Sequence, residues 1–422
     1  MADRIKQTNS KLLFITVALW IGTSLWPIFG HVVSYVMTLL VIIIGLNRYP
    51  MIFRTRAFIH ITLFLLICLL YSLMGKGYPF LNVAILLPTY FACIVASYGI
   101  SMMSRKQVYA LFVFFVGLLL FLTISTFFIL QEEPNAVRYI GYGENSEIGV
   151  TKSMALTYTR RGMYSYGIGE ALAVITPAFI AYALFTKSRV ISLLLLITII
   201  MSIITQVLGT LATSLLITIV FSIAVLFTIF LGAGGKQKLR YGLFIIAFVL
   251  IGLYYIVPIF LENGSIMMKL IDIEDSYATG ESTGQVGGRT DLLLQSLSVF
   301  LRNPILGLGN IPQFFGDKTT GNTVSMHTAF FDYLGLYGMF AFFFFSSWKK
   351  AIDFTFRKMN KKHKKVYIWC LLSALFLCVL KGPVSLATTF MFSTVFVGIV
   401  FMMMYHDSNE SVNYNEKNCN LG

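Results

Sequence analysis

Gly287-Gly288-Arg289-Thr290-Asp291 opens the stretch around which this chain is organised. Asn303-Pro304-Ile305-Leu306-Gly307-Leu308-Gly309 comes next, then Met326-His327-Thr328, and finally Asp332-Tyr333-Leu334-Gly335-Leu336-Tyr337-Gly338. An arginine can bind phosphate oxygens through two parallel hydrogen bonds, and a histidine can exchange a proton near neutral pH. Because most of the remaining chain is apolar, we expect this stretch at the mouth of a hydrophobic helical bundle.

The composition indicates a membrane protein. The chain has 422 residues, of which 57% are hydrophobic and 12% charged, whereas soluble proteins carry about 25% charged residues. A net charge of +14 would suggest nucleic acid as a partner of a soluble protein, but in a membrane protein the positions of the charges must be considered first. The five cysteines imply no disulfide framework, and no cysteine or histidine spacing suggests a metal site.

Apolar runs of close to 20 residues predict helices that cross the bilayer. The expected fold is an all-α polytopic membrane protein with about 12 transmembrane helices. The runs lie at 12–29, 31–46, 57–74, 79–100, 107–130, 163–186, 190–206, 210–232, 241–261, 328–348, 366–381 and 384–404. The split between the seventh and eighth runs is placed near Gln206–Thr210, because the apolar stretch there is too long for one span.

The charges predict the orientation. With the N-terminus in the cytoplasm, 22 of the 32 basic residues fall in cytoplasmic segments, and 11 of the 18 acidic residues fall in two long outside loops. Both termini are therefore expected in the cytoplasm. The predicted parts are helices 1–5 in 1–130, a first extracytoplasmic loop 131–162, helices 6–9 in 163–261, a large catalytic loop 262–326, helices 10–12 in 327–404, and a disordered tail 405–422.

The loop 262–326 is long enough to carry function. Thr290–Phe300 has apolar residues at helical spacing, which predicts a short helix lying on the membrane surface with Arg289 at its start. Arg289 either binds phosphate or pairs with Asp291 as an ordinary loop residue. Arg160 and Arg161 end the other long loop, before a helix expected to begin near Gly162. There they form an anion site at a helix N-terminus or anchor the chain among headgroups.

The remaining polar candidates lie near the predicted helix ends. His327 is a candidate acid–base residue or a polar cap at the start of the tenth span, and Asp332 follows it by five residues. Glu170 is an intramembrane carboxylate, which faces a cavity or a polar partner. Lys381 is expected at the membrane interface between the last two spans. The glycines of the motifs most simply permit turns and close helix packing.

In order and spacing, Arg289, Asn303–Gly309, His327 and Asp332–Gly338 resemble the O-antigen ligase/polymerase family. Arg160-Arg161-Gly162 is similar to an arginine–glycine segment of that family. The resemblance implies a metal-independent, inverting glycosyltransferase of the GT-C-like class that uses no cofactor and lies in the cytoplasmic membrane of a bacterium. It also implies that Arg289 binds the diphosphate of an undecaprenyl-diphosphate-linked oligosaccharide and that His327 is catalytic.

The chain departs from the family pattern at two places. Family members often carry a Ser-Arg pair where this chain reads Thr210-Leu211-Ala212-Thr213-Ser214, and a His-Asn pair where it reads His327-Thr328. Either Arg160 or Arg161 supplies the second phosphate-binding charge, or the phosphates are bound differently.

These features favour a polymerase of lipid-linked repeat units for a capsule, exopolysaccharide or O-antigen. In the predicted site His327 and Asp332 are catalytic, Arg289, Arg160 and Arg161 bind diphosphate, and the supporting residues are Glu170, Asp291 and Lys381. A ligase uses the same chemistry with another acceptor, and a flippase or transporter is the alternative of a different class. The expected partners are a repeat-unit flippase and a chain-length regulator, and no nucleic acid is expected.

Overall fold

A computed structural model describes residues 2–28, 31–76, 78–134, 136, 152–209, 211–235, 238–239, 242, 246, 284–307, 311, 323–382 and 386–419. The secondary-structure elements in this part of the chain are helices. They are α1 (Ala2–Leu25), α2 (His31–Arg48), η1 (Pro50–Arg54), α3 (Arg56–Leu73), α4 (Phe80–Met102), α5 (Arg105–Glu132), α7 (Lys152–Arg160), α8 (Tyr166–Phe185), α9 (Arg189–Leu208), α10 (Ala212–Leu231), α14 (Gly284–Arg302), α15 (Ala329–Tyr337), η4 (Gly338–Phe340), α16 (Ala341–Phe356), α17 (Lys361–Leu380), α18 (Leu386–Met391), η6 (Phe392–Phe396) and α19 (Val397–Cys419).

Eight helices of the described chain are long and apolar enough to cross a membrane, and shorter apolar helices occupy Lys11–Leu25, Val32–Arg48 and Leu86–Met102. The protein is therefore a polytopic helical membrane protein. Each predicted run coincides with one of these helices except 241–261, most of which lies outside the described residues. The number of spans stays a prediction.

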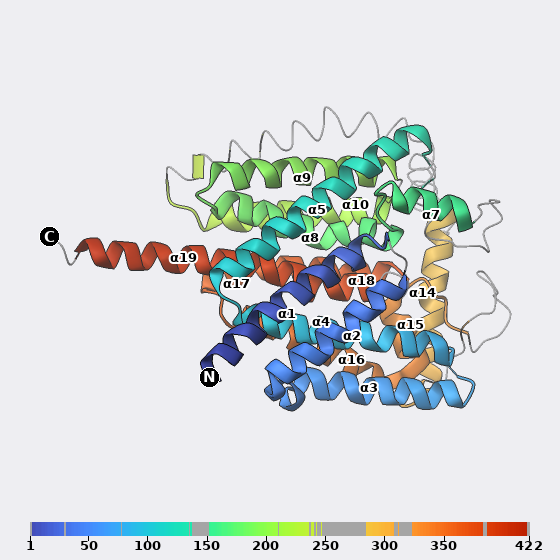
Figure 1. Ribbon diagram of the computed structural model, residues 1–422. Helices are drawn as coiled ribbons and strands as arrows, with labels where there is room; N and C mark the ends of the chain where they lie inside the picture. The colour runs from blue at the N-terminus through green and yellow to red at the C-terminus, as the bar shows by residue number, and fades with distance from the viewer. Residues whose placement is uncertain are drawn as a thin grey trace.

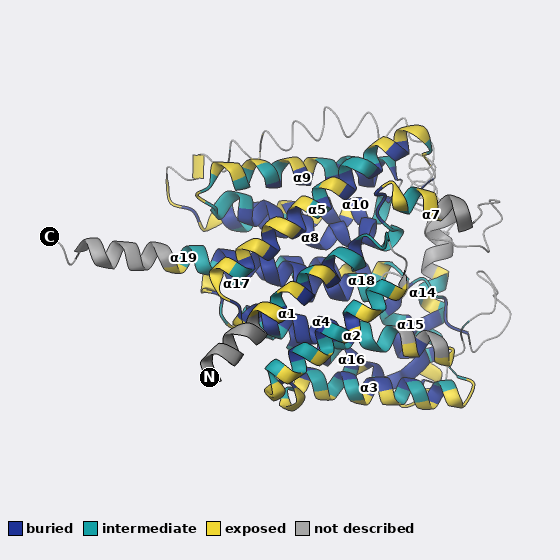
Figure 2. Ribbon diagram, in the orientation of Figure 1, coloured by how far each residue is buried: buried dark blue, intermediate teal, exposed yellow. Residues whose placement is uncertain are grey.

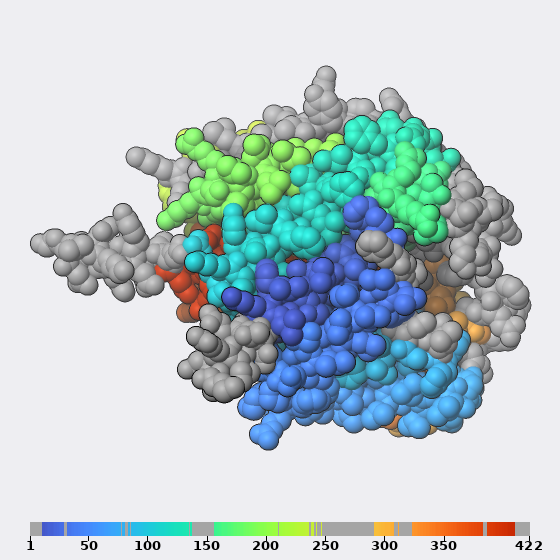
Figure 3. Space-filling view, viewed as in Figure 1, coloured from blue at the N-terminus to red at the C-terminus, as the bar shows by residue number. Residues whose placement is uncertain are grey.

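The most deeply buried helices are α8 and the continuous pair α18–α19. Among the 18 most apolar consecutive residues, 83% are buried in α8 and 89% in the segment Leu386–Asn409, which contains α18 and η6 and the start of α19. The corresponding share in α3 is 33%. Figure 1 shows most helices running side by side with α8 and α18 among them, and Figure 2 shows that most residues of both are buried. In Figure 3, α1 and α5 lie at the front of the molecule, and only small red areas of α19 can be seen beside them. The outer helices leave leucine and phenylalanine side chains exposed, as lipid contact requires.

The bundle has two distinct ends (Figure 1). At one, which we call the terminal end, α1 begins and α19 ends, whereas α7 and α14 lie at the opposite, loop end. At the terminal end Arg105 of α5 forms an ion pair with Asp407 of α19 at 2.9 Å. The helices α7 and α14 come from the predicted loops 131–162 and 262–326, most of whose other residues lie outside the described part of the chain. Which side faces the cytoplasm stays a prediction.

The loop end contains more helix than expected. Part of the predicted loop 131–162 forms α7, and the predicted helix 290–300 is confirmed but begins earlier, at Gly284. Figure 1 shows α14 running across the end of the bundle rather than along it, which suits a helix at the membrane surface. The predicted start of the sixth span near Gly162 is wrong. Ser165 caps α8 by accepting a hydrogen bond from the Ile168 backbone N–H, so α8 begins at Tyr166.

Aromatic side chains fix α15 between other helices. The Tyr333 ring lies 5.7 Å from Phe64 of α3 and 5.2 Å from Phe344 of α16, measured between centroids. Tyr337, one turn later, lies 5.3 Å from the Phe64 centroid. Since aromatic pairs at these separations are favourable beyond their buried area, α15 and the residues before it have a defined position at the loop end.

Candidate functional site

Asp332 joins α14 to the residues before α15. Its carboxylate is fully buried, and Oδ1 accepts hydrogen bonds from the hydroxyls of Ser296 (2.5 Å) and Ser325 (3.1 Å). Oδ2 accepts from the Thr328 backbone N–H at 3.0 Å. The Ser296 hydroxyl oxygen also accepts from the Ser325 backbone N–H at 2.9 Å. The predicted catalytic carboxylate is thus engaged in the packing of α14 on the segment 323–328.

His327 lies on this segment, and its backbone is held from several directions. It is half-buried, and its backbone N–H donates to the Ser325 hydroxyl at 3.2 Å. Gly382 packs so closely that a Cβ there would clash with the Met326 carbonyl. The Ala329 backbone N–H donates to the Lys381 carbonyl at 2.7 Å. His327 is therefore placed next to the end of α17.

Met326 adopts a backbone conformation that residues other than glycine rarely adopt. Its φ is 59°, which makes it the one described residue other than glycine with a positive φ. Such a conformation costs about 1–3 kcal/mol and is found most often at functional sites. The strain immediately before His327 supports a functional role for this segment.

Glu170 and Lys381 form a buried ion pair beside the same segment. Lys381 Nζ lies 2.6 Å from Glu170 Oε1, and the two side chains are 12% and 1% exposed. Lys381 Nζ also donates to the Tyr166 hydroxyl at 3.1 Å. Burial alone would lower the pKa of Lys381, but the carboxylate of Glu170 outweighs it and the pKa is raised. Lys381, expected at the interface, is therefore a buried cation, and the pair ties α8 to the end of α17.

Arg160 and Arg161 lie at the end of a helix rather than at the start of one. Arg160 is the last residue of α7, and the chain then turns at Gly162, whose φ is +92°. The expected contribution of a helix N-terminus is therefore wrong for these residues, because α8 starts at Tyr166. Arg161 pairs with Glu132 at 2.7 Å, whereas Arg160 is exposed and has no ion pair within the described part of the chain.

Arg289 lies inside α14, as its sixth residue. Its side chain lies outside the described residues. Seven residues, close to two turns, separate Arg289 from Ser296, so the two backbone positions share the face of α14 that meets the segment 323–328. Asp291 is exposed. The structure thus brings the helix that carries Arg289 to the segment that carries His327.

The glycine motifs allow the turn at Gly307 and the turn at Gly338 to approach each other closely. Gly307 and Gly338 have φ values of +73° and +56°. A Cβ at Gly338 would lie 2.5 Å from the Ile305 carbonyl oxygen, and one at Gly335 would lie 3.2 Å from the Ser296 carbonyl oxygen. The prediction that these glycines permit turns and close packing is confirmed, while Gly309 lies outside the described residues.

Sequence reasoning missed the partners of the site residues. Ser296 and Ser325 have no distinguishing pattern, and their contact with Asp332 joins positions up to 36 apart. Tyr166 and the left-handed conformation of Met326 were also missed. A serine on the inner face of α14 was the one available signal, since buried hydroxyls require a partner.

At the loop end, the half-buried His327 therefore lies on the segment 323–328. This segment lies between the buried ion pair of Glu170 and Lys381 and the helix α14, which contains Arg289. Such an arrangement can accept a proton from a hydroxyl and provide positive charge for a departing phosphate.

A family model described as O-antigen ligase matches residues 193–346. The matched residues extend from α9 into α16 and include α14, the segment 323–328 and α15. No curated protein matches the chain. Over these residues the chain is similar to the O-antigen ligase/polymerase-like family, whose members are glycosyltransferase-like enzymes of polysaccharide assembly.

Proposed function

We propose that this protein polymerises oligosaccharide repeat units linked to undecaprenyl diphosphate, at the outer face of the bacterial cytoplasmic membrane. The proposal rests on one observation. The segment of His327 is fixed against both α14, which contains Arg289, and the buried pair of Glu170 and Lys381.

The proposed reaction is one displacement at the anomeric carbon of the donor. A hydroxyl oxygen of the acceptor forms the new bond to this carbon, while the bond from the carbon to the diphosphate oxygen breaks. His327 takes the proton of the hydroxyl, and Arg289 neutralises the charge that develops on the diphosphate. A single displacement inverts the configuration of the anomeric carbon. The bond broken in the donor supplies the free energy, so no ATP is required. In this proposal Arg289, rather than a metal ion, neutralises the diphosphate.

Asp332 and the pair of Glu170 and Lys381 are positioning residues in this proposal. Asp332 accepts three hydrogen bonds within the packing of α14, and the ion pair supports the end of α17 that contacts Met326 and Ala329. Arg160, which is exposed at the same end, is proposed as the second phosphate-binding cation.

A ligase is the second candidate, because the matching family model is described as an O-antigen ligase. The displacement is the same in both enzymes, and only the acceptor differs. A polymerase transfers the growing glycan to the sugar of another lipid-linked repeat unit, whereas a ligase transfers a finished glycan to a different acceptor molecule.

The test of the proposal is polymer length in a strain that lacks the chromosomal gene. Because phosphate binding by two parallel hydrogen bonds requires a guanidinium, Arg289→Lys should abolish polymer as completely as Arg289→Ala. Arg302→Ala is the matched control, since Arg302 lies at the opposite end of α14, about 20 Å away. Normal polymer from Arg289→Ala at normal protein level would remove Arg289 from the site.

A further inference from the structure

A cavity of about 690 Å³ lies at the terminal end of the bundle, away from the proposed active site. It is formed where α8 ends, α9 begins and α17 begins. Its basic lining residues are Lys187, Arg189 and Lys362, and its apolar lining includes Leu184, Leu193 and Leu196.

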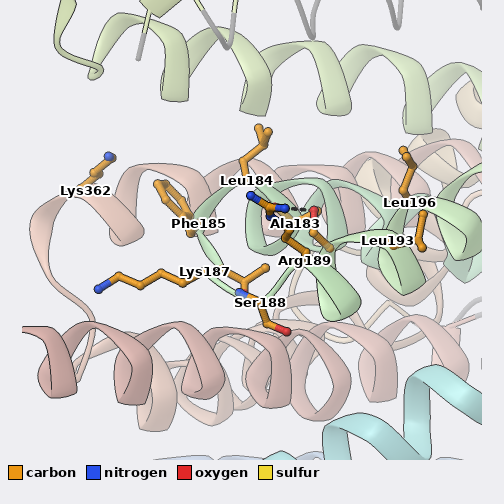
Figure 4. A pocket seen from close by; sticks show the side chains of 11 residues that line it. Ala183, Leu184, Phe185, Lys187, Ser188, Arg189, Leu193, Leu196 and Lys362 are labelled. Carbon is orange, nitrogen blue, oxygen red and sulfur yellow. Dashed lines mark hydrogen bonds between the residues drawn. The ribbon is translucent and has the colours of Figure 1, made fainter. Parts of the chain in front are cut away.

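The basic and apolar linings are separated along the cavity. Figure 4 shows the side chains of Lys187 and Lys362 toward one end and those of Leu193 and Leu196 toward the other. The ammonium group of Lys362 lies 4.7 Å from the centroid of the Phe185 ring, which holds it at the cavity wall. The cavity therefore offers positive charge at the bundle end and a hydrocarbon surface deeper along α9.

The positive charge in the cavity is uncompensated within the described part of the chain. None of the described lining residues is acidic, and no described carboxylate pairs with Lys187, Arg189 or Lys362. The N-termini of α9 and α17 also lie at this end and add partial positive charge. Three cations around one cavity repel each other, so an anion bound there would be stabilised.

We propose that this cavity binds the phosphate headgroup of an anionic phospholipid, with an acyl chain along Leu193 and Leu196. The helices α8, α9 and α17 are candidate membrane spans, so their ends lie at the level of lipid headgroups. Basic pockets between transmembrane helices recognise such headgroups. The leucine wall favours a lipid over free phosphate, because free phosphate gains nothing from apolar surface. The proposal does not depend on the enzymatic reaction.

Native mass spectrometry of the full-length protein in detergent tests this proposal. The probes are dioleoyl phosphatidylglycerol, dioleoyl phosphatidylcholine and inorganic phosphate. We expect the wild type to retain one phosphatidylglycerol and no phosphatidylcholine. In the triple variant Lys187→Gln, Arg189→Gln and Lys362→Gln, affinity for phosphatidylglycerol should fall by about two orders of magnitude, because each basic side chain near a membrane surface contributes about a fivefold preference.

A second triple variant provides the matched control. Arg54→Gln, Lys106→Gln and Lys349→Gln removes the same charge from exposed residues that do not line the cavity, and it should retain phosphatidylglycerol like the wild type. Melting temperatures in lipid-free detergent check folding, and the single variant Lys362→Glu replaces the cavity triple if the latter does not fold.

Three results would overturn the proposal. The first is equal retention of phosphatidylglycerol by the cavity variant and the wild type. The second is an equal loss in the control variant, since that loss would show general attraction to surface charge. The third is displacement of phosphatidylglycerol from the wild type by inorganic phosphate, since that result would make the occupant a free anion.

Discussion

The backbone around His327 is positioned by hydrogen bonds to the side chains of Ser325 and Asp332. Thr328 occupies the N-cap position of α15, and the Asp332 carboxylate accepts the Thr328 backbone N–H. His327 is therefore not the residue that caps α15, which was one of the two interpretations of the sequence.

Replacement of Asp332 tests whether this carboxylate positions the segment or reacts. We predict that Asp332→Ala lowers the melting temperature, because the hydroxyls of Ser296 and Ser325 and the Thr328 N–H lose a buried acceptor, at about 1–3 kcal/mol for each unsatisfied group. The double variant Ser296→Ala with Asp332→Ala should be little worse than Asp332→Ala alone, since the two residues share one network. An Asp332→Asn variant that melts like the wild type but has no turnover would instead make Asp332 a catalytic residue.

The effects on stability of replacing Glu170 and Lys381 are expected to depend on each other, because the two side chains form one buried ion pair. Lys381→Met should destabilise the protein by about 3–5 kcal/mol, because it leaves the Glu170 carboxylate buried without its cation. The double variant Lys381→Met with Glu170→Gln should melt closer to the wild type. Thermal melting in one detergent compares the three proteins, and a double variant less stable than Lys381→Met would contradict the prediction.

Among the elements, the contact of the turn at Gly307 with the turn at Gly338 sets how α14 and α15 pack. We predict that Gly338→Ala sharply reduces folded protein, because φ is +56° and the new Cβ would lie 2.5 Å from the Ile305 carbonyl oxygen. The control is Gly117→Ala in α5, where a Cβ meets nothing within 4 Å. The yield of monodisperse protein after detergent extraction measures the effect, and equal yields would contradict it.

The sequence predicts elements better than it predicts contacts between them. Helical runs were recognisable because apolar length is a local property, and the glycines of Asn303–Gly309 and Asp332–Gly338 indicated tight turns. The pairing of Glu170 with Lys381 was not predictable from one sequence, because 211 positions separate them and the folded bundle alone brings them together. The helix α7 was missed since its composition is polar and loop-like.

For the whole molecule, the charge distribution predicts which end faces outward. In a Cys419→Ser background, cysteines introduced at Asn145 and Thr283 should react with an impermeant thiol reagent added to intact cells, and one at Lys361 should not. The native Cys68, Cys93, Cys370 and Cys378 are buried and should remain silent. Labelling at Lys361 with silence at Thr283 would invert the topology and exclude a reaction at the outer face.

The most direct measurement of the proposed activity uses purified enzyme and a synthetic repeat unit on undecaprenyl diphosphate. The wild type should lengthen the glycan on the lipid, and a chelator should leave the rate unchanged. His327→Ala should lower turnover by about 10²–10⁴-fold, the contribution of a general base, while donor affinity stays near that of the wild type. Turnover by His327→Ala at the wild-type rate, or no glycan extension by wild-type enzyme that binds the donor, would contradict the proposed function.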